Sequence, residues 1–538
     1  MQKRTSCFLV VGAALVLLSV GLMGTQELAT DQTLRVVITG GDVTTIDPHK
    51  STAGNRALCD MLFDGLLRYK PGTTTEFEPD LAAAMPEAQI VDGKQVWTFH
   101  LREGVNVHPF PGYPVGYELT AEDVVYSLER AANPEFSAFS GSYAGMTFDV
   151  VDTYVVSITL EEPLGPYLFF PKVANYAGGF IVPARAAEQL GVDEFNLHPV
   201  GTGPFIFSDY TPGDKLVLTR NPDYFRGTPI IEKVESYFMA ESSTRELSLQ
   251  AGDLDMCFID YTQDTVDRME AHGIPVRLIG PGATIVLYLN TALAPLDSLE
   301  VRQAIAYALD RQDNAAYYGM LSAPLYSQAS TMMPGGLSVD DIMNAGLDYV
   351  IERDLVEARR LLSEAGYPDG FTLEATTTEH TNYLPAMEIA RVQLEEIGIE
   401  LKLDVVDHST FHQRIRQDLY PIVPYSCARE SADAYLTQFW HSDSRAVVGE
   451  SPVTNFSQYA NPTVDGLIEL ARQETAADTQ IDLWKLAQIE ILRDAAMYPL
   501  IYLQVVVAVQ EYVELGYDLE GSMNIFPPIT IDTKLLKH

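Results

Sequence analysis

Three short patterns in this sequence could support chemistry, beginning with Gly-Thr-Gly at the start of the stretch 201–229. A glycine loop of that kind can cradle a phosphate with its backbone N–H groups. Here, however, Pro204 has no N–H to donate, and Ile206 occupies the place of the third glycine. The stretch instead alternates around Pro212-Gly213, a pair typical of turns. It therefore predicts a β-hairpin and no nucleotide site.

The other two patterns are a histidine pair and an aspartate pair. His408 and His412 are four residues apart, so they could share a helix face and bind a metal ion. With no third ligand nearby in the sequence, a solvated face is the favoured interpretation. Asp253 and Asp255 alternate at a strand end, which is more typical of a polar turn than of a catalytic carboxylate pair.

Signatures of the main enzyme classes are missing from the sequence. It contains no H-E-x-x-H, G-x-S-x-G or G-x-x-x-x-G-K-[ST] motif. We therefore predict no metal site, no cofactor and no enzyme activity. The remote alternative is a secreted hydrolase that uses paired carboxylates.

The elements that must position these residues alternate between strands and helices. A β-branched run at 34–39 predicts a buried strand, and Thr120 with Asp123 predicts the start of a helix. Residues 234–259 indicate strand, helix and strand, and 352–407 twice indicate helix then strand. This order predicts an α/β fold with a second α/β lobe. Because no long Pro/Ser linker occurs, we expect the chain to cross between lobes more than once.

Length and charge limit the class of protein further. The 538 residues, 47% of them hydrophobic, are enough for two or more lobes with sizeable cores. The 74 acidic against 35 basic residues leave a net charge of −39, which makes DNA and RNA poor partners. A solvated acidic surface is the favoured interpretation, and collection of cations is the alternative.

The N-terminus resembles a secretory signal over residues 1–30. Lys3 and Arg4 precede an apolar run, 7–23, and small and polar residues follow it. A cleaved signal is favoured over an uncleaved anchor, so we expect a secreted or periplasmic protein.

Most of the cysteines and tryptophans are predicted to be structural residues. Only Cys59, Cys257 and Cys427 follow the signal, so at most one internal disulfide can form. Buried free thiols are favoured over a Cys257–Cys427 bridge. By their spacing, Trp97 belongs to a sheet core and Trp484 to a helical core, whereas Trp440 lies beside a loop and is a candidate to face a ligand. The 28 tyrosines suit a cleft that holds a flexible organic solute.

Taken together, a series of motifs resembles the extracytoplasmic solute-binding proteins of ABC importers, in the family that binds peptides, nickel chelates and some oligosaccharides. The resemblance covers the chain from about residue 34 to the C-terminal region. Its motifs, in the family's order, are TTIDPHKS, MLFDGLLRY, FEPDLAAAMPEA, WTFHLREGVNVH, LTAEDVVYSLERA, the stretch 201–229, LQAGDLDM, LNT, VRQAIAYALDR, ARRLLSEAGYPDGF and VQLEEIGIEL.

The resemblance implies a two-lobed periplasmic-binding-protein type 2 fold with a hinge between its lobes. Lobe I would comprise 31–62, 200–284 and 500–538, with an extra subdomain at 63–199, and lobe II would comprise 285–499. Such a protein closes on its ligand and delivers it to the permease and ATPase subunits of an importer. We expect a monomer that binds a small molecule without changing it.

The resemblance also implies which positions contact the ligand. They are Thr52, Gly54, Tyr143 (with Ser140 as the alternative), Tyr425, Ser426 and Arg429, to which the loop residue Trp440 is added.

Arg429 decides between ligand classes. Peptide-binding members carry an acidic residue at this position for the α-amino group, so the charge here is reversed. The loop 375–384 also lacks the arginine that dipeptide binders use for the carboxylate, and it contains His380 instead. Arg429 either faces an anionic or hydroxyl-rich ligand or pairs with a neighbour such as Glu430 or Asp433, because an unpaired buried charge is costly. The ligand is a peptide by family default, with an oligosaccharide or other anionic or polyhydroxyl solute as the alternative.

Overall fold

The computed structural model describes residues 27–50, 55–260, 262–280, 282–380, 382–417, 420–429, 431–445, 454–524 and 526–537. The apolar run of the predicted signal and the predicted ligand residues Thr52 and Gly54 lie outside the described residues. Within the described ranges, we find no helix with the length and apolar character needed to cross a membrane.

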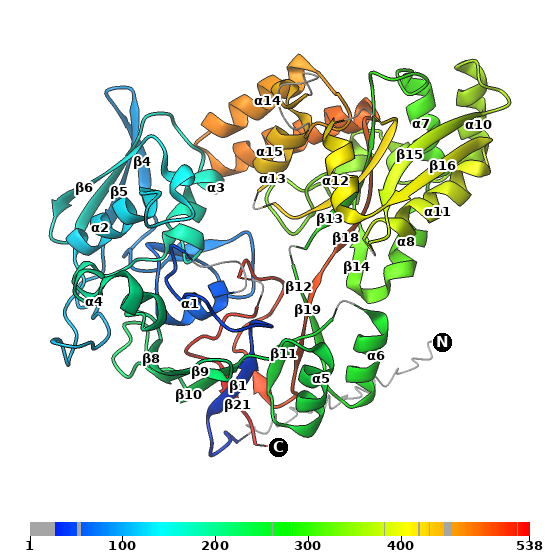
Figure 1. The fold of residues 1–538 in the computed structure, drawn as a ribbon. Coiled ribbons are helices and arrows are strands. Elements are labelled where there is room, and N and C mark those ends of the chain that lie inside the picture. Colours follow the sequence, from blue (N-terminus) through cyan, green and yellow to red (C-terminus); the bar gives the residue numbers. More distant parts are fainter. Residues whose placement is uncertain are drawn as a thin grey trace, which may run out of the picture.

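A seven-stranded sheet with a separate four-stranded subdomain forms the first lobe (Figure 1). The seven-stranded sheet has the order β12-β19-β11-β1-β10-β9-β8, and β1 pairs in parallel with both β10 and β11. Its strands are β1 (Thr33–Val37), β8 (Phe205–Thr211), β9 (Lys215–Arg220), β10 (Lys233–Tyr237), β11 (Met256–Phe258), β12 (Val276–Ile279) and β19 (Val505–Val509). Helices α1 (Arg56–Leu62), α5 (Ser242–Ala251) and α6 (Gln263–Ala271) accompany it.

The subdomain is the part of the first lobe that contains α2 and α4 (Figure 1). Its antiparallel sheet has the order β4-β5-β7-β6. Its elements are β4 (Glu87–Val91), β5 (Lys94–His100), β6 (Met146–Asp152), β7 (Val155–Leu160), α2 (Ala121–Ala132), α3 (Pro166–Phe169) and α4 (Ala184–Leu197). Two small strand pairs complete the first lobe: β2 (Leu67–Tyr69) with β3 (Phe77–Pro79), and β20 (Val513–Glu514) with β21 (Lys534–Leu535).

The second lobe contains a four-stranded sheet, β14-β18-β13-β17, and a parallel pair, β15 with β16. The strands are β13 (Thr284–Leu289), β14 (Ser322–Pro324), β15 (Phe371–Thr378), β16 (Ile399–Val406), β17 (Ile422–Cys427) and β18 (Met497–Leu503). The helices are α7 (Leu299–Ala308), α8 (Arg311–Tyr318), α9 (Val339–Asn344), α10 (Leu355–Glu364), α11 (Leu384–Glu395), α12 (His408–Gln417), α13 (Ala432–Trp440), α14 (Pro462–Gln473) and α15 (Ala477–Arg493).

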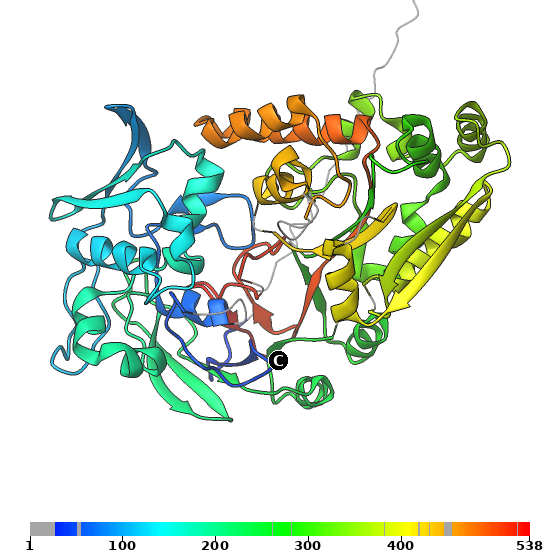
Figure 2. The same cartoon turned by 45° about the horizontal axis from the view of Figure 1, so that its top comes forward.

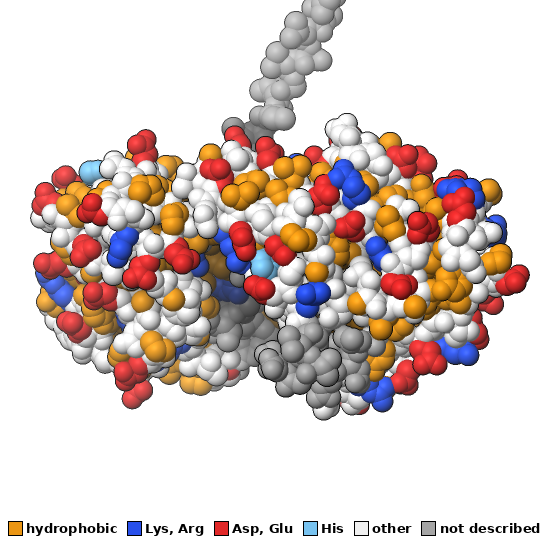
Figure 3. Space-filling model, turned by 90° about the horizontal axis from the view of Figure 1, so that it is seen from above, with side chains coloured by type: hydrophobic (Ala, Val, Ile, Leu, Met, Phe, Trp, Pro, Cys, Tyr) orange, Lys and Arg blue, Asp and Glu red, His pale blue; other side chains and the backbone are white. Residues whose placement is uncertain are grey.

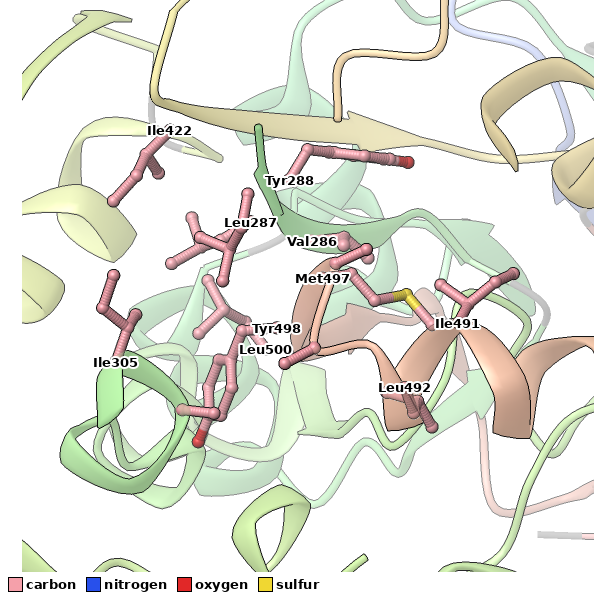
Figure 4. Packing of buried hydrophobic residues seen from close by; sticks show 14 of the residues in the cluster. Val286, Leu287, Tyr288, Ile305, Ile422, Ile491, Leu492, Met497, Tyr498 and Leu500 are labelled. Carbon is pink, nitrogen blue, oxygen red and sulfur yellow. The ribbon is translucent and has the colours of Figure 1, made fainter. Parts of the chain in front are cut away.

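Each lobe has its own hydrophobic core. The buried cluster of the second lobe draws all its members from between Ile285 and Ile501, and Figure 4 shows β13 and β18 contributing Val286, Leu287 and Leu500 to it. Two further clusters fill the first lobe, and one of them also includes Leu321 from the second lobe. Separate cores allow the lobes to move as bodies, because moving one against the other breaks few apolar contacts.

Two neighbouring crossings of the chain join the sheets of the two lobes. Strand β18 ends at Leu503 and β19 begins at Val505, so Gln504 alone separates the two sheets there. The second crossing runs from β12 to β13. Gly282 belongs to it, and a Cβ at Gly282 would lie 1.4 Å from the carbonyl oxygen of Leu503, so only glycine fits between the two crossings.

Local predictions agree closely with the structure. The hairpin is formed by β8 and β9, and Gly213 at its turn has a φ of 72°. Helix α2 begins with the predicted capping box between Thr120 and Asp123. The cysteines Cys59, Cys257 and Cys427 are buried, and Cys257 and Cys427 form no disulfide, so the alternative of a bridge between these two is wrong for this structure. Burial raises the pKa of the Cys427 thiol to about 11, so the thiol is neutral at physiological pH.

Candidate functional site

A cavity of about 600 Å³ lies between the lobes and takes its walls from both. From the first lobe it is lined by Arg56, Phe139, Ser142, Tyr143, Glu162, Leu164, Tyr167, Leu168, Pro171, Lys172, Tyr176, Ala177 and Gly178. From the second lobe it is lined by Ser431, Asp433, Ala434 and Arg472. Figure 2 shows the second-lobe helices α14 and α15, in orange, reaching across toward the subdomain.

Tyr143, which the resemblance implies as a ligand contact, lies in the first-lobe wall of the cavity. Its hydroxyl donates a hydrogen bond of 2.8 Å to the carbonyl of Lys172, and burial raises its pKa, so the phenol stays neutral. A Cβ on Gly178 would lie 2.8 Å from the Tyr143 hydroxyl, so the glycine makes room for this ring. The residue is therefore a fixed, uncharged part of the wall.

Arg56, the first residue of α1, is one of the charged groups of the same wall, together with Glu162 and Lys172. Its guanidinium carbon lies 4.4 Å from the centroid of the Tyr176 ring, which is a cation–π contact. Its Nε is buried and has no hydrogen-bond partner. The described residues provide no carboxylate within 4.0 Å of this guanidinium.

The opposite wall is the N-terminal part of α13 with the C-terminal part of α14. Ser431 caps α13 and accepts a hydrogen bond from the backbone N–H of Ala434. Asp433 accepts from Arg472 Nε at 3.0 and 3.3 Å, and Thr437 also accepts from Arg472. The positive charge of Arg472 is therefore neutralised within the second lobe.

At one rim of the cavity, hydrogen bonds join the first lobe to the second. The backbone N–H of Gly165 donates to the carbonyl of Arg472 at 3.0 Å, and that of Tyr167 donates to Gln480 Oε1 at 3.2 Å. A Cβ at Gly165 would lie 2.0 Å from Gln480 Nε2, so glycine is what lets the backbones approach. The lobes thus touch beside α3 while the cavity separates them further along.

The predicted residues on β17 lie away from these walls. The Tyr425 ring is buried against Phe439 and Phe456, and the backbone N–H and carbonyl of Ser426 both bond the Tyr383 hydroxyl. None of the four predicted residues Tyr425, Ser426, Arg429 and Trp440 is among those lining the cavity.

Arg429 is engaged inside its own lobe. Its Nε donates to Gln438 Oε1 at 2.6 Å, its Nη1 donates to the carbonyl of Ala428, and its guanidinium carbon lies 5.4 Å from the Phe439 ring centroid. The acidic neighbour that reaches the cavity is Asp433, although it pairs with Arg472 and not with Arg429.

Trp440 belongs to the core of the second lobe. Its side chain is 0% exposed, its ring stacks on Tyr288 with centroids 5.2 Å apart, and its indole N–H donates to Gln328. A solute in the cavity cannot reach this side chain. Helical spacing would have placed it correctly, because Trp440 shares the buried face of α13 with Leu436.

Sequence reasoning missed Arg56, Tyr176 and Arg472 as cavity residues. Arg56 follows the predicted position Gly54 by only two residues, which is the one signal that pointed toward it. Tyr176 and Arg472 lie in segments without a motif, and only the packing of α14 against the first lobe brings Arg472 to the cavity.

The histidine pair gains a neighbour in the structure. His408 and His412 have Nε2 atoms 3.2 Å apart, and the His380 ring stacks on His408 with centroids separated by 4.9 Å. In the part of the chain that the structure describes, however, no three His, Cys, Asp or Glu side chains are arranged to hold a metal ion.

A second polar cavity, of about 340 Å³, lies entirely within the first lobe. Its charged lining residues include Asp60, Asp64, Asp80, Arg68 and Arg226. Arg226 donates to Asp80 at 2.9 Å, and Arg68 donates to Glu78 at 2.5 Å. Asp64 accepts from the hydroxyls of Thr202 and Tyr224 at 2.7 and 2.8 Å.

Comparisons with known proteins agree with this architecture. The model of the bacterial extracellular solute-binding proteins, family 5 (Middle), matches residues 76–446. The probable D,D-dipeptide-binding periplasmic protein DdpA of Escherichia coli K12 is 25% identical over 480 residues, which cover 87% of this chain and 88% of DdpA.

Solved structures cover nearly the whole chain. MoaA of A. tumefaciens R10, in complex with mannopinic acid, is 34% identical with a TM-score of 0.65, covering 94% of this chain and all of that one. DppA of Helicobacter pylori, in complex with the peptide STSA, is 25% identical with a TM-score of 0.64, covering 95% and 99%. The chain belongs to family 5 of the bacterial extracellular solute-binding proteins, which confirms the resemblance found in its sequence.

Proposed function

We propose that this protein is the substrate-binding component of an ABC importer and captures a peptide-like solute outside the cytoplasm. The observation that carries the proposal is the cavity of about 600 Å³ whose walls come from both lobes. Membership of the solute-binding family supports the same function. The lobe boundaries expected from the sequence, with the subdomain at 63–199, belong to this proposal.

Closure of the lobes follows from linkage. A solute that contacts Tyr143 on one wall and Ser431 on the other binds the closed form better than the open one. It therefore shifts the population toward closure. The two short crossings at Gly282 and Gln504 are where the backbone angles change. The permease then receives the closed, loaded protein, and no bond of the solute is broken. The protein acts as a monomer.

An anionic or polyhydroxyl solute is the second candidate. It is favoured by MoaA, the 34% identical protein whose structure contains mannopinic acid. Arg56 in the cavity wall, which has no carboxylate partner among the described residues, also suits an acidic solute better than a neutral one.

Melting temperature against a solute library tests the function. A solute at 100 times its Kd stabilises a binding protein by about 2.7 kcal/mol and is recovered unchanged. Native mass spectrometry of the protein as purified would identify a retained solute. If a solute is converted to a product, the protein is a hydrolase and the proposal is wrong.

A further inference from the structure

The charge of the interlobe cavity differs from that of the whole protein. The chain has a net charge of −39, yet the described residues that line the cavity include three basic ones, Arg56, Lys172 and Arg472, against two acidic ones, Glu162 and Asp433. Figure 3 shows acidic side chains over both halves of one face, and both basic and acidic side chains beside the gap between the halves. The charge of the described cavity lining therefore differs in sign from the net charge of the protein.

The three basic residues are not equivalent. Arg472 is paired with Asp433, and Lys172 has an interaction of its own within the protein. Glu162, the other carboxylate of the cavity, is exposed to solvent and makes no ion pair with Arg56. Across the described ranges, Nε of Arg56 has no hydrogen-bond partner, and no carboxylate lies within 4.0 Å of the guanidinium.

The position of Arg56 is nevertheless fixed. Its guanidinium lies 4.4 Å from the Tyr176 ring centroid, and stacking of this kind restricts the side chain without using any of its N–H donors. Tyr176 in turn packs edge-on against Tyr69, with ring centroids 6.0 Å apart. Among the described residues, the buried Nε–H is a donor without an acceptor, and a buried donor left unsatisfied is unfavourable.

We propose that Arg56 binds a carboxylate of the imported solute, so that the protein selects solutes with a free carboxyl group. The inference rests on the proposed function. The planar fork of a guanidinium matches the two oxygens of a carboxylate, and the bond is charge-assisted. Tyr176 holds that fork toward the cavity before the solute arrives, so little side-chain freedom is lost on binding.

The experiment measures solute affinity by calorimetry with two probes, mannopinic acid and the peptide Ser-Thr-Ser-Ala. It compares the wild type with Arg56→Gln and Arg56→Lys. The peptide is also tested with its C-terminal carboxylate converted to an amide. Arg391→Gln on the outer face of α11, where Arg391 pairs with Glu388, is the matched control because it also removes an arginine.

We expect Arg56→Gln to weaken binding of a carboxylate probe by at least about tenfold, because a charge-assisted hydrogen bond is lost. Arg56→Lys keeps the positive charge but loses the planar fork of the guanidinium, so its affinity for the carboxylate probe should lie between those of the wild type and Arg56→Gln. Arg391→Gln should bind as the wild type does. Amidation of the peptide should weaken its binding to the wild type by the same factor as Arg56→Gln weakens binding of the unmodified peptide. The Arg56→Gln variant should bind the acid and the amide with equal affinity.

The outcomes separate the two proposals. If Arg56→Gln binds the acid probes as tightly as the wild type, the inference is wrong and the importer function stands. The same holds if the wild type does not distinguish acid from amide, which can be measured even if the variant fails to fold. If neither probe nor any component of a casein hydrolysate raises the Tm of the wild type, the proposed function fails and the inference with it.

Discussion

The two polar cavities of this protein differ in whether their charged groups have partners within the chain. In the first-lobe cavity, Arg226 pairs with Asp80, and hydroxyls satisfy Asp64. In the interlobe cavity, Asp433 neutralises Arg472. Arg56, by contrast, stacks on the Tyr176 ring and has no counter-ion among the described residues. A cavity whose charges are satisfied by the chain itself stabilises the fold, whereas one with an unsatisfied donor is prepared for a ligand.

Exposure separates the two cavities as well. The Asp80 side chain is 2% exposed and its partner Arg226 is 19% exposed, whereas Asp433 and Arg472 are 13% and 36% exposed. Breaking an ion pair in the first cavity should therefore reduce stability, and breaking one in the second should mainly change binding.

The largest expected effect is that of Arg226→Met. It removes the ion-pair partner of the buried Asp80 and leaves the charge of Arg68 as the remaining opposite charge, so the free energy of unfolding should fall by about 3–5 kcal/mol. Urea denaturation measures it. Arg220→Met, which removes an arginine from an exposed pair with Glu232, should cost less than about 1 kcal/mol. Equal losses in the two variants would show that the first cavity is not a structural network.

The next largest effect should be a dependence of the unfolding free energy on pH that is caused by Asp64. Burial, with a further contribution from the charge of Asp80, raises the pKa of Asp64 to about 7, whereas an unfolded Asp titrates near ~3.9. The stabilising contribution of protonated Asp64 is therefore complete below about pH 4 and is lost as the pH rises through about 7.

Asp64→Asn tests this titration because it cannot ionise. Between pH 5 and 8 the wild type should lose on the order of 2 kcal/mol of unfolding free energy relative to the variant. Parallel curves for the two proteins would mean that Asp64 does not hold a proton in this range.

A smaller effect is expected in the interlobe cavity for Asp433→Asn. It leaves Arg472 without its carboxylate, so the unfolding free energy should change by less than about 1 kcal/mol for this partly exposed pair. Affinity for an acidic solute such as mannopinic acid should rise, because a second cation becomes available. Lower affinity in calorimetry would indicate that Asp433 itself contacts the solute.

The smallest effect should follow Arg429→Gln. The guanidinium of Arg429 is held by Gln438 and Phe439 and is not part of the cavity lining, so its loss should weaken solute binding less than Arg56→Gln does. If Arg429→Gln had the larger effect in the same titration, the reversed charge noted in the sequence would mark the ligand site after all.

The sequence by itself determined the local elements and the family. Pro212-Gly213 set the turn of the β8–β9 hairpin, and Thr120 with Asp123 began α2, because turns and caps depend on residues a few positions apart. The order of many weak motifs gave the family for the same reason: each motif is local, and their succession can be read along the chain.

Tertiary structure alone decided which side chains meet between the lobes. Arg56 and Arg472 are 416 positions apart, and nothing near either one shows that Asp433 neutralises the second and not the first. Trp440 and Arg429 follow the same strand, yet both are directed into their own lobe by the packing of α13. Whether a charge is satisfied depends on contacts between distant segments, and these exist only after the lobes have folded.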